Sequence, residues 1–318
     1  MEKIETYADV QFLVDFCFNQ PENIFDNKYY EWAKIYETLS KKCLLIIDSK
    51  DNLLKGVNNP AIKHLIKLSS SGGSEIIEYE EYFNMITDDE KVILNINNVS
   101  SIFCLSRTKI NNRCGFFVSS FEECYQKFSL MNTEIDPISV SRGKDNQFKS
   151  WSNYFNNTPP LNNIIIADNY ILDKTETFDR NLFAVLDAII PKYRIDETID
   201  ISIIVRRDLI NPEKKYDIIE NFLKIKDNNF NLNIHLTPKD KPHDRIIISN
   251  YFYVTSGHSL DFFNAKGNIN KETVLNYFPI CSIKSIKSFY KEISKLSEYT
   301  KNSKFIGNNS NRILDYHR

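Results

Sequence analysis

Apolar positions in the first half of the chain follow two spacings, and each spacing predicts a type of element. Short runs in which nearly every residue is apolar predict buried strands, whereas apolar residues three or four positions apart predict helices that face a core. Strands are predicted at 9–18, 43–47, 76–83, 91–96, 101–105 and 115–119, and helices at 28–41, 60–68 and 121–128. This alternation is typical of an α/β layer.

The second half repeats the alternation and ends in a polar tail. Strands are predicted at 163–167, 199–205, 231–236, 246–249 and 251–255, and helices at 178–190, 212–226, 271–278 and 286–299. We therefore predict a second α/β domain, with a mixed sheet flanked by helices.

A polar stretch separates the two halves. It ends in a double proline, Pro159–Pro160, which is a strong signal of a break between elements. The sequence therefore predicts an N-terminal α/β domain at 1–131, a linker at 132–161 and a C-terminal domain at 162–318.

Composition narrows the classes of function. The 318 residues are 42% hydrophobic, enough for a sizeable core, and 40 Lys and Arg against 42 Asp and Glu give a net charge of −2. The chain lacks the excess of basic residues that dedicated nucleic-acid binders usually have, although a protein with this net charge can still contain a local basic pocket. No apolar run is long enough to span a membrane, and the mixed charge of residues 1–5, without an apolar stretch, predicts that there is no secretory signal. Six cysteines without paired spacing then predict a reduced, cytoplasmic protein.

One motif carries recognisable chemistry. His243 and Arg245 are two positions apart, so a strand would point both side chains to one face. Asn250 follows after four residues and Gly257 after six more, with Ser259 close behind. This spacing resembles the phospholipase D superfamily motif H-x-K-x4-D-x6-G-S, with Arg in place of Lys, Asn in place of Asp, and the Ser one position late.

A closer resemblance is to the phospholipase D-like domain at the C-terminus of MIT-domain proteins, over about residues 162–300. It is carried by Asp168-x-Tyr170-Ile171 and by the segment from Gly257 to Phe263. The resemblance implies a phospholipase D-like fold without its catalytic pair, which binds ligands or membranes. Similar domains occur in prokaryotic proteins, some of them in phage defence, so it also implies a possible antiviral role.

The predicted site is a phosphate pocket. Arginine binds phosphate through two parallel hydrogen bonds, and no cofactor is needed for this. The expected ligand is a nucleic acid, a nucleotide or a lipid head group, and the N-terminal domain would serve as an effector or partner-protein module. The predicted ligand-binding residues are His243, Arg245, Asn250, Ser259, Asp168 and Arg206.

Three alternatives stay open at this point. A homodimer would bring two copies of His243 together, and His243 would then be the catalytic residue of a phosphodiesterase or nuclease. Alternatively, Asp48, Glu78 and Glu81 would bind Mg²⁺ in an N-terminal nuclease, because carboxylates after strands are typical Mg²⁺ ligands. The third alternative is a protein–protein scaffold in which the His-Asp-Arg segment is structural.

Overall fold

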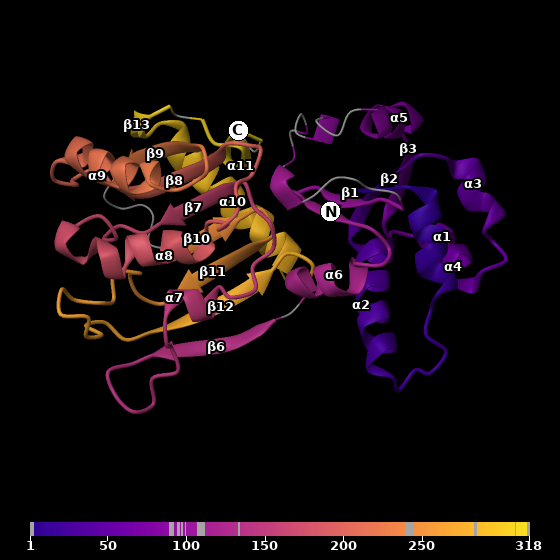
Figure 1. Cartoon of the computed structure of the whole chain (residues 1–318), viewed down its shortest axis with the longest axis horizontal. Coiled ribbons are helices and arrows are strands. Elements are labelled where there is room, and N and C mark those ends of the chain that lie inside the picture. The colour runs from indigo at the N-terminus through magenta and orange to yellow at the C-terminus, as the bar shows by residue number, and fades with distance from the viewer. Residues whose placement is uncertain are drawn as a thin grey trace. The chain divides into compact units, whose positions relative to one another are not determined.

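The chain forms two compact α/β units (Figure 1). Unit 1 comprises Met1–Thr133 and Cys281–Lys287, and unit 2 comprises Glu134–Ile280 and Ser288–Arg318. The fold class is therefore the predicted one. This computed structural model describes residues 3–88, 92, 93, 96, 98, 100–106, 112–132, 134–238, 245–282, 285–308 and 310–316.

The described strands of unit 1 form one parallel sheet of five. The strand order is β3-β2-β1-β4-β5, so the chain builds outward from β1 to one side and then returns to the other side. The order reverses between β1 and β4, the position where open α/β sheets usually bind ligands. The strands are β1 (Ile4–Ala8), β2 (Cys43–Ile47), β3 (Glu75–Glu78), β4 (Ile102–Cys104) and β5 (Phe117–Ser119).

Most consecutive residues of the central strands are buried, because helices cover this sheet. On one face, Tyr82 and Phe83 of α5 pack with Tyr7 and Phe103. Helices α1 and α2 contact α4, and α2 also contacts α6. The helices are α1 (Val10–Phe18), α2 (Asn27–Lys41), α3 (Lys50–Lys55), α4 (Pro60–Ser69), α5 (Glu80–Asp88) and α6 (Cys124–Asn132), with a 3-10 turn at Asn112–Cys114.

The strand predicted at 9–18 is wrong, because this segment is helix α1. Asp9 caps the helix by accepting a hydrogen bond from the amide of Phe12, at 2.7 Å. The buried side chains then recur at helical spacing: Val10, Leu13, Phe16 and Cys17 are all at most 5% exposed.

The strand predicted at 76–83 is half right, because β3 ends at Glu78 and α5 begins at Glu80. The strands predicted at 43–47, 101–105 and 115–119 and the helices predicted at 28–41, 60–68 and 121–128 have the predicted type, whereas β1 and α3 were not predicted. Most of the strand predicted at 91–96 lies outside the described residues.

The described strands of unit 2 form one mixed sheet of eight, in the order β13-β9-β8-β7-β10-β11-β12-β6. β7, β8 and β9 are parallel, and the other pairs are antiparallel. The strands are β6 (Ile135–Val140), β7 (Asn163–Ala167), β8 (Ile199–Arg206), β9 (Phe230–Thr237), β10 (Arg245–Ser249), β11 (Phe252–Ser256), β12 (Thr273–Pro279) and β13 (Lys304–Gly307).

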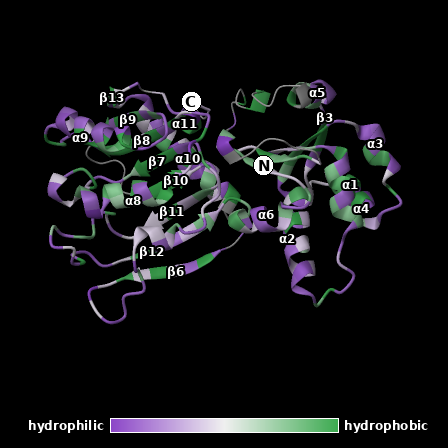
Figure 2. Ribbon diagram, in the orientation of Figure 1, coloured by the Kyte–Doolittle hydropathy of each residue, from purple (hydrophilic) through white to green (hydrophobic). Residues whose placement is uncertain are grey.

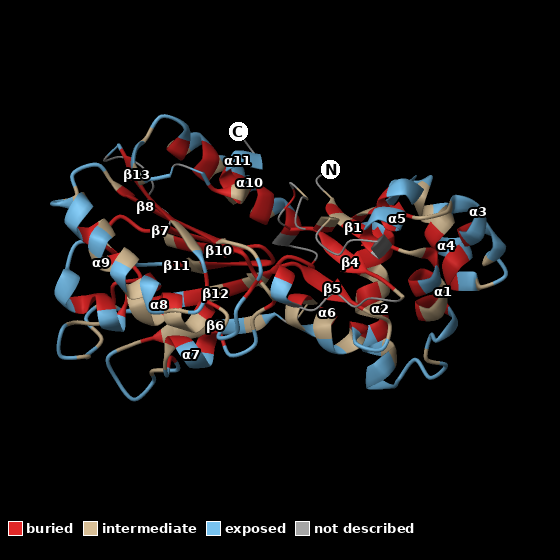
Figure 3. Ribbon diagram, turned by 45° about the horizontal axis from the view of Figure 1, so that its top comes forward, coloured by how far each residue is buried: buried red, intermediate tan, exposed pale blue. Residues whose placement is uncertain are grey.

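Apolar side chains of these strands form the core of unit 2 with α7, α8 and α9. Figures 2 and 3 show the central strands as mostly hydrophobic and buried. The helices are α7 (Trp151–Tyr154), α8 (Leu182–Ile189), α9 (Pro212–Lys224), α10 (Ser285–Lys301) and α11 (Arg312–Tyr316), with a 3-10 turn at Thr175–Arg180. Among the described residues, no helix combines the length and apolarity needed to cross a membrane.

Three predictions fail in unit 2, and in each case distant parts of the chain decide the structure. The segment 134–161, predicted within the linker, contributes β6 to the sheet, and its Trp151 is only 2% exposed. The helix predicted at 271–278 is β12, whose burial alternates with a period of two. The polar tail forms β13 on β9 and then α11.

The strand order brings three strand ends together at one edge of this sheet. β7 lies between β8, which is parallel to it, and β10, which is antiparallel. The carboxyl ends of β7 and β8 therefore meet the beginning of β10 at the same edge.

Candidate functional site

Three strands bring charged residues together at this edge. Ala167, the last residue of β7, pairs with Ile204 of β8 and with Ile246 of β10. Asp168 comes next, so it lies opposite Arg245 on one side and near the end of β8, Arg206, on the other. Neighbouring strands are about 4.8 Å apart, which puts the two arginine backbones within about 10 Å of each other.

Asp168 is a fully buried carboxylate at the base of the site. Ser259 Oγ lies 2.9 Å from both carboxylate oxygens, and the amides of Tyr170 and Leu260 also donate to them. Burial raises the pKa of Asp168, while these donors and the charge of Arg245 act to lower it. Asp168 therefore ties the segment after β7 to the segment after β11.

Two cations gather at the ring of Tyr170, two residues further on. The guanidinium carbon of Arg206 lies 4.6 Å from the ring centre, and Lys271 Nζ lies 5.4 Å from it. Lys271 also forms an ion pair with Asp261, at 3.2 Å. A positive group over an aromatic face is attracted by the ring quadrupole, so Tyr170 holds both cations at the edge.

A buried lysine fixes the segment that carries Tyr170. Lys215 of α9 is 6% exposed, and its Nζ donates to the backbone oxygens of Leu172 and Asp173. Burial lowers the pKa of Lys215. Lys215 and Asp168 both bind the backbone of the loop after β7, so the backbone that carries the Tyr170 ring is fixed.

Most of the predicted pocket residues lie at this edge. Arg245, Ser259, Asp168 and Arg206 are brought together there. His243 lies outside the described residues. The structure thus groups four of the predicted residues, and the place of His243 in the pocket stays a prediction.

Asn250 does not belong to the pocket, which corrects the prediction. It follows the far end of β10, five residues from Arg245, or about 17 Å along the strand. Its Oδ1 accepts from the amides of Asn162 and Asn163, both at 3.0 Å, and its Nδ2 donates to Asn162 Oδ1 at 2.8 Å. Asn250 is fully buried and ties the start of β7 to the end of β10.

Two lysines at this edge, Lys271 and Lys215, were not among the predicted site residues. Lys271 was assigned to a helix, but the alternation after it, with Thr273, Leu275 and Tyr277 buried, is that of a strand. That period-two pattern could have placed Lys271 just before a strand rather than in a helix. Lys215 looks like one more exposed helix lysine in the sequence, and only the packing of α9 shows its role.

The carboxylates predicted to bind Mg²⁺ lie in unit 1. Asp48 follows β2, and its Oδ1 accepts from the amide of Val10 at 2.8 Å. Glu78 ends β3, Glu81 lies in the first turn of α5, and both are exposed. Among the described residues, no group of three or more His, Cys, Asp or Glu side chains is placed to hold a metal ion. The magnesium alternative stays a prediction.

Asp9 is the carboxylate at the point where the strand order of unit 1 reverses. Its oxygens accept from the amide of Phe12 (2.7 Å), the amide of Ser106 (2.7 Å) and Ser106 Oγ (2.9 Å). Burial raises the pKa of Asp9, and the charge of Asp48 contributes in the same direction. The amino end of α1 is therefore bound by two carboxylates of the protein itself.

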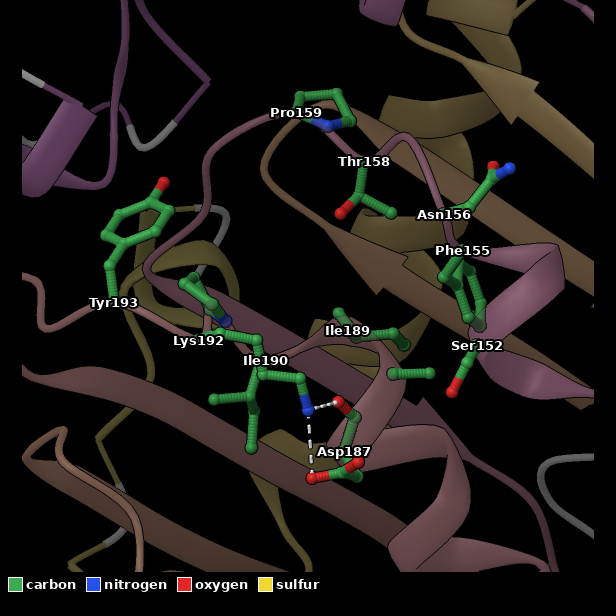
Figure 4. Close-up of a pocket in the computed structure, with 12 residues that line it drawn as sticks. Ser152, Phe155, Asn156, Thr158, Pro159, Asp187, Ile189, Ile190, Lys192 and Tyr193 are labelled. Carbon is green, nitrogen blue, oxygen red and sulfur yellow. Dashed lines mark hydrogen bonds and ion pairs between the residues drawn. The ribbon is translucent and has the colours of Figure 1, made fainter.

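A separate pocket of about 290 Å³ lies beside the carboxyl end of α8 (Figure 4). In it, Lys192 Nζ pairs with the Asp187 carboxylate at 3.0 Å and donates to the Asp187 backbone oxygen. Lys226 pairs with the same carboxylate, at 2.6 Å. None of the residues predicted from the sequence lines this pocket, and its charges are already neutralised in part by these pairs.

Comparison with known proteins gives a similarity to a solved structure. No protein-family model matches the chain, and no curated protein matches it. Among solved structures, the chain is similar to TrmBL2, an archaeal chromatin protein whose structure is described as showing a novel mode of DNA binding. The match has 15% sequence identity and a TM-score of 0.28, and it covers 57% of this chain and 60% of that chain.

Proposed function

We propose that unit 2 binds a phosphate-containing ligand (a nucleic acid, a nucleotide or a lipid head group) at the edge where β7 and β8 end and β10 begins. The observation that carries the proposal is Arg206. The guanidinium carbon of Arg206 lies 4.6 Å from the centre of the Tyr170 ring, and its Nε lies 3.1 Å from a carboxylate oxygen of Asp208. The N–H groups on the two terminal nitrogens of a guanidinium can bind two phosphate oxygens side by side while Nε stays paired with Asp208.

The surroundings of Arg206 strengthen its attraction for an anion. Its side chain is only 21% exposed, so water screens it less than it screens a surface arginine. Its ion pair is with Asp208, at 3.1 Å, and that carboxylate is 47% exposed. Arg245 and Lys271 add two more positive charges at the same edge. The resemblance to phospholipase D-like domains supports a phosphate ligand at this position.

Direct binding measurements test the proposal. Fluorescence anisotropy would compare dye-labelled single-stranded DNA, double-stranded DNA and RNA, with inorganic phosphate, ATP and phosphatidylserine vesicles as competitors. Arg206→Gln is expected to weaken binding at least tenfold, because a hydrogen bond to a charged group contributes about 1.5–3 kcal/mol. Arg207→Gln removes the same charge one residue away, from an exposed side chain, and is expected to change affinity less than about threefold.

Each outcome of this comparison decides the matter. Equal losses for the two variants would mean that only net charge acts, and the pocket would be wrong. No affinity for any probe would also overturn the proposal and leave the scaffold alternative. Cleavage of an oligonucleotide in the same samples would show that the site is catalytic as well as binding.

A further inference from the structure

A series of nearly parallel rings runs through the helices of unit 1. Phe12 and Phe16 of α1 are followed by Trp32 and Tyr36 of α2 and by His64 of α4. Successive ring centres are 6.2, 5.5, 4.8 and 6.0 Å apart, with interplanar angles of 2°, 12°, 10° and 22°. Phe12 and Phe16 are fully buried, whereas His64 is exposed. The series therefore begins in the core and ends at the surface.

Hydrogen bonds fix the ring at the exposed end. Tyr36 OH donates to the backbone oxygen of Ala61 at 2.8 Å and lies 3.0 Å from His64 Nδ1. A phenol has one proton, so the proton in the second bond comes from Nδ1. The imidazole is thus held in one orientation, with Nε2 on the side away from Tyr36.

Helix α4 adds positive charge around this ring. Lys63 precedes His64, and Lys67 lies three residues after it, on the same side of the helix. Both lysines are exposed, and neither forms an ion pair with a described residue. The helix sequence, PAIKHLIKLS, contains no acidic residue. The helix thus presents a fixed planar ring between two available ammonium groups.

We propose that this face of α2 and α4 binds single-stranded nucleic acid, with one base stacked on His64 and the adjoining phosphates on Lys63 and Lys67. A planar base continues a series of parallel rings, and proteins that bind single strands combine such stacking with backbone charge contacts. The lysines complement phosphates and would repel a basic partner surface. The inference uses only residues of unit 1, so it does not depend on the phosphate site of unit 2.

The test separates bases from phosphates. Dye-labelled oligothymidylate is compared with an abasic oligonucleotide of the same length and charge, by anisotropy at fixed salt, with the full chain carrying Arg206→Gln. His64→Ala is expected to weaken oligothymidylate binding about five- to tenfold, from the lost stacking, and to leave abasic binding within about twofold. Lys67→Gln is expected to weaken both oligonucleotides equally.

Two further variants act as controls. His64→Phe keeps a stacking ring and is expected to retain most of the preference for oligothymidylate. Tyr30→Ala removes an exposed aromatic ring of α2, 62% exposed and outside the series, and should have no effect. Equal binding of the two oligonucleotides by the starting protein would overturn the proposal, as would equal losses for His64→Ala and Tyr30→Ala.

The same data keep the two proposals apart. When the chain that keeps Arg206 is measured beside Arg206→Gln, failure of the unit 2 site would appear as equal abasic binding by the two proteins. Failure of the stacking site would appear as a missing difference between bases and abasic residues, which would assign this face to another partner such as a protein.

Discussion

The two sheets place a carboxylate at the same structural position, after a central strand. Asp9 follows β1 in unit 1 and Asp168 follows β7 in unit 2. Each accepts from a serine hydroxyl that lies far away in sequence, Ser106 in the first case and Ser259 in the second. Each also accepts from backbone amides of the segment after its own strand. The carboxylate therefore has the same structural task in both units, which is to join two loops.

The charges around the two carboxylates differ, and they determine which ligands each edge can attract. Asp9 has Asp48 as its charged neighbour, and both bind amides at the start of α1. A helix start that could bind a phosphate is thus already filled by the anions of the protein. Asp168 faces Arg245 instead. The positive charge of Arg245 near Asp168 therefore favours an anion in unit 2, and the negative charge of Asp48 near Asp9 disfavours one in unit 1.

The largest expected effect is that of Asp168→Ala on the stability of unit 2. The change leaves Ser259 Oγ and two amides without their acceptor and removes the charge opposite Arg245, a loss of about 3–5 kcal/mol. Asp9→Ala in unit 1 should cost less, about 1–3 kcal/mol, because its charged neighbour is another carboxylate.

The chain's two tryptophans, one in each unit, allow this comparison to be measured. Urea unfolding of Asp168→Ala is followed through Trp151 in a Trp32→Phe background, and that of Asp9→Ala through Trp32 in a Trp151→Phe background. A loss for Asp9→Ala equal to or larger than that for Asp168→Ala would show that the charge partner is not what distinguishes the two edges.

The second largest effect concerns Asn250, which sequence spacing placed in the pocket. Asn250→Ala removes the acceptor of two buried amides, so unit 2 should lose about 2–3 kcal/mol of stability. Affinity for the phosphate probe should stay unchanged in conditions where the variant is folded. A selective loss of affinity with normal urea unfolding would return Asn250 to the binding site.

Local pattern was enough to predict the elements whose own residues show a clear strand or helix spacing. The strand at 163–167 and the pairing of a helix at 28–41 with a strand at 43–47 follow from residues in direct succession. The predictions failed where the structure of a segment depends on a partner strand that is far away in the sequence. The segment 135–140 is polar enough for a linker, and only its antiparallel pairing with β12 makes it a strand.

The site was predictable to the same extent. Arg206 and Asp168 could be named because each lies at the end of an apolar strand, a position that the sequence shows. Lys271 lies near the ring of Tyr170 although the two residues are about one hundred positions apart in the sequence. Asn250 lies away from Arg245 because the two residues are at opposite ends of β10. Motif spacing fixes which residues share a strand but not which of them lie at the same end of it.

A smaller effect is a dependence of stability on pH. Burial raises the pKa of Asp168, so its contribution to stability is fully present below its ordinary pKa of about 4 and is lost as pH rises through the folded value. The wild type should therefore weaken relative to Asp168→Asn as pH increases from about 4 to 7, by at most about 1.4 kcal/mol per pH unit.

Asp9 provides the matched case, because burial also raises its pKa. The difference between wild type and Asp9→Asn should therefore have the same sign over the same range. Urea unfolding at several pH values measures both. A slope of opposite sign at Asp168 alone would show that Arg245 and the hydrogen bonds outweigh burial there.

The smallest expected effect is that of Asp48→Asn. The amide oxygen still accepts from Val10 but binds the start of the helix more weakly than a carboxylate does, whereas the lost charge relieves repulsion with Asp9, so the two consequences largely cancel. Unit 1 should change by less than about 0.5 kcal/mol, measured through Trp32. The same samples test the magnesium alternative. An Mg²⁺-dependent rise in the unfolding midpoint that disappears in Asp48→Asn would make the unit 1 edge a cation site, and the two edges would then bind ligands of opposite charge.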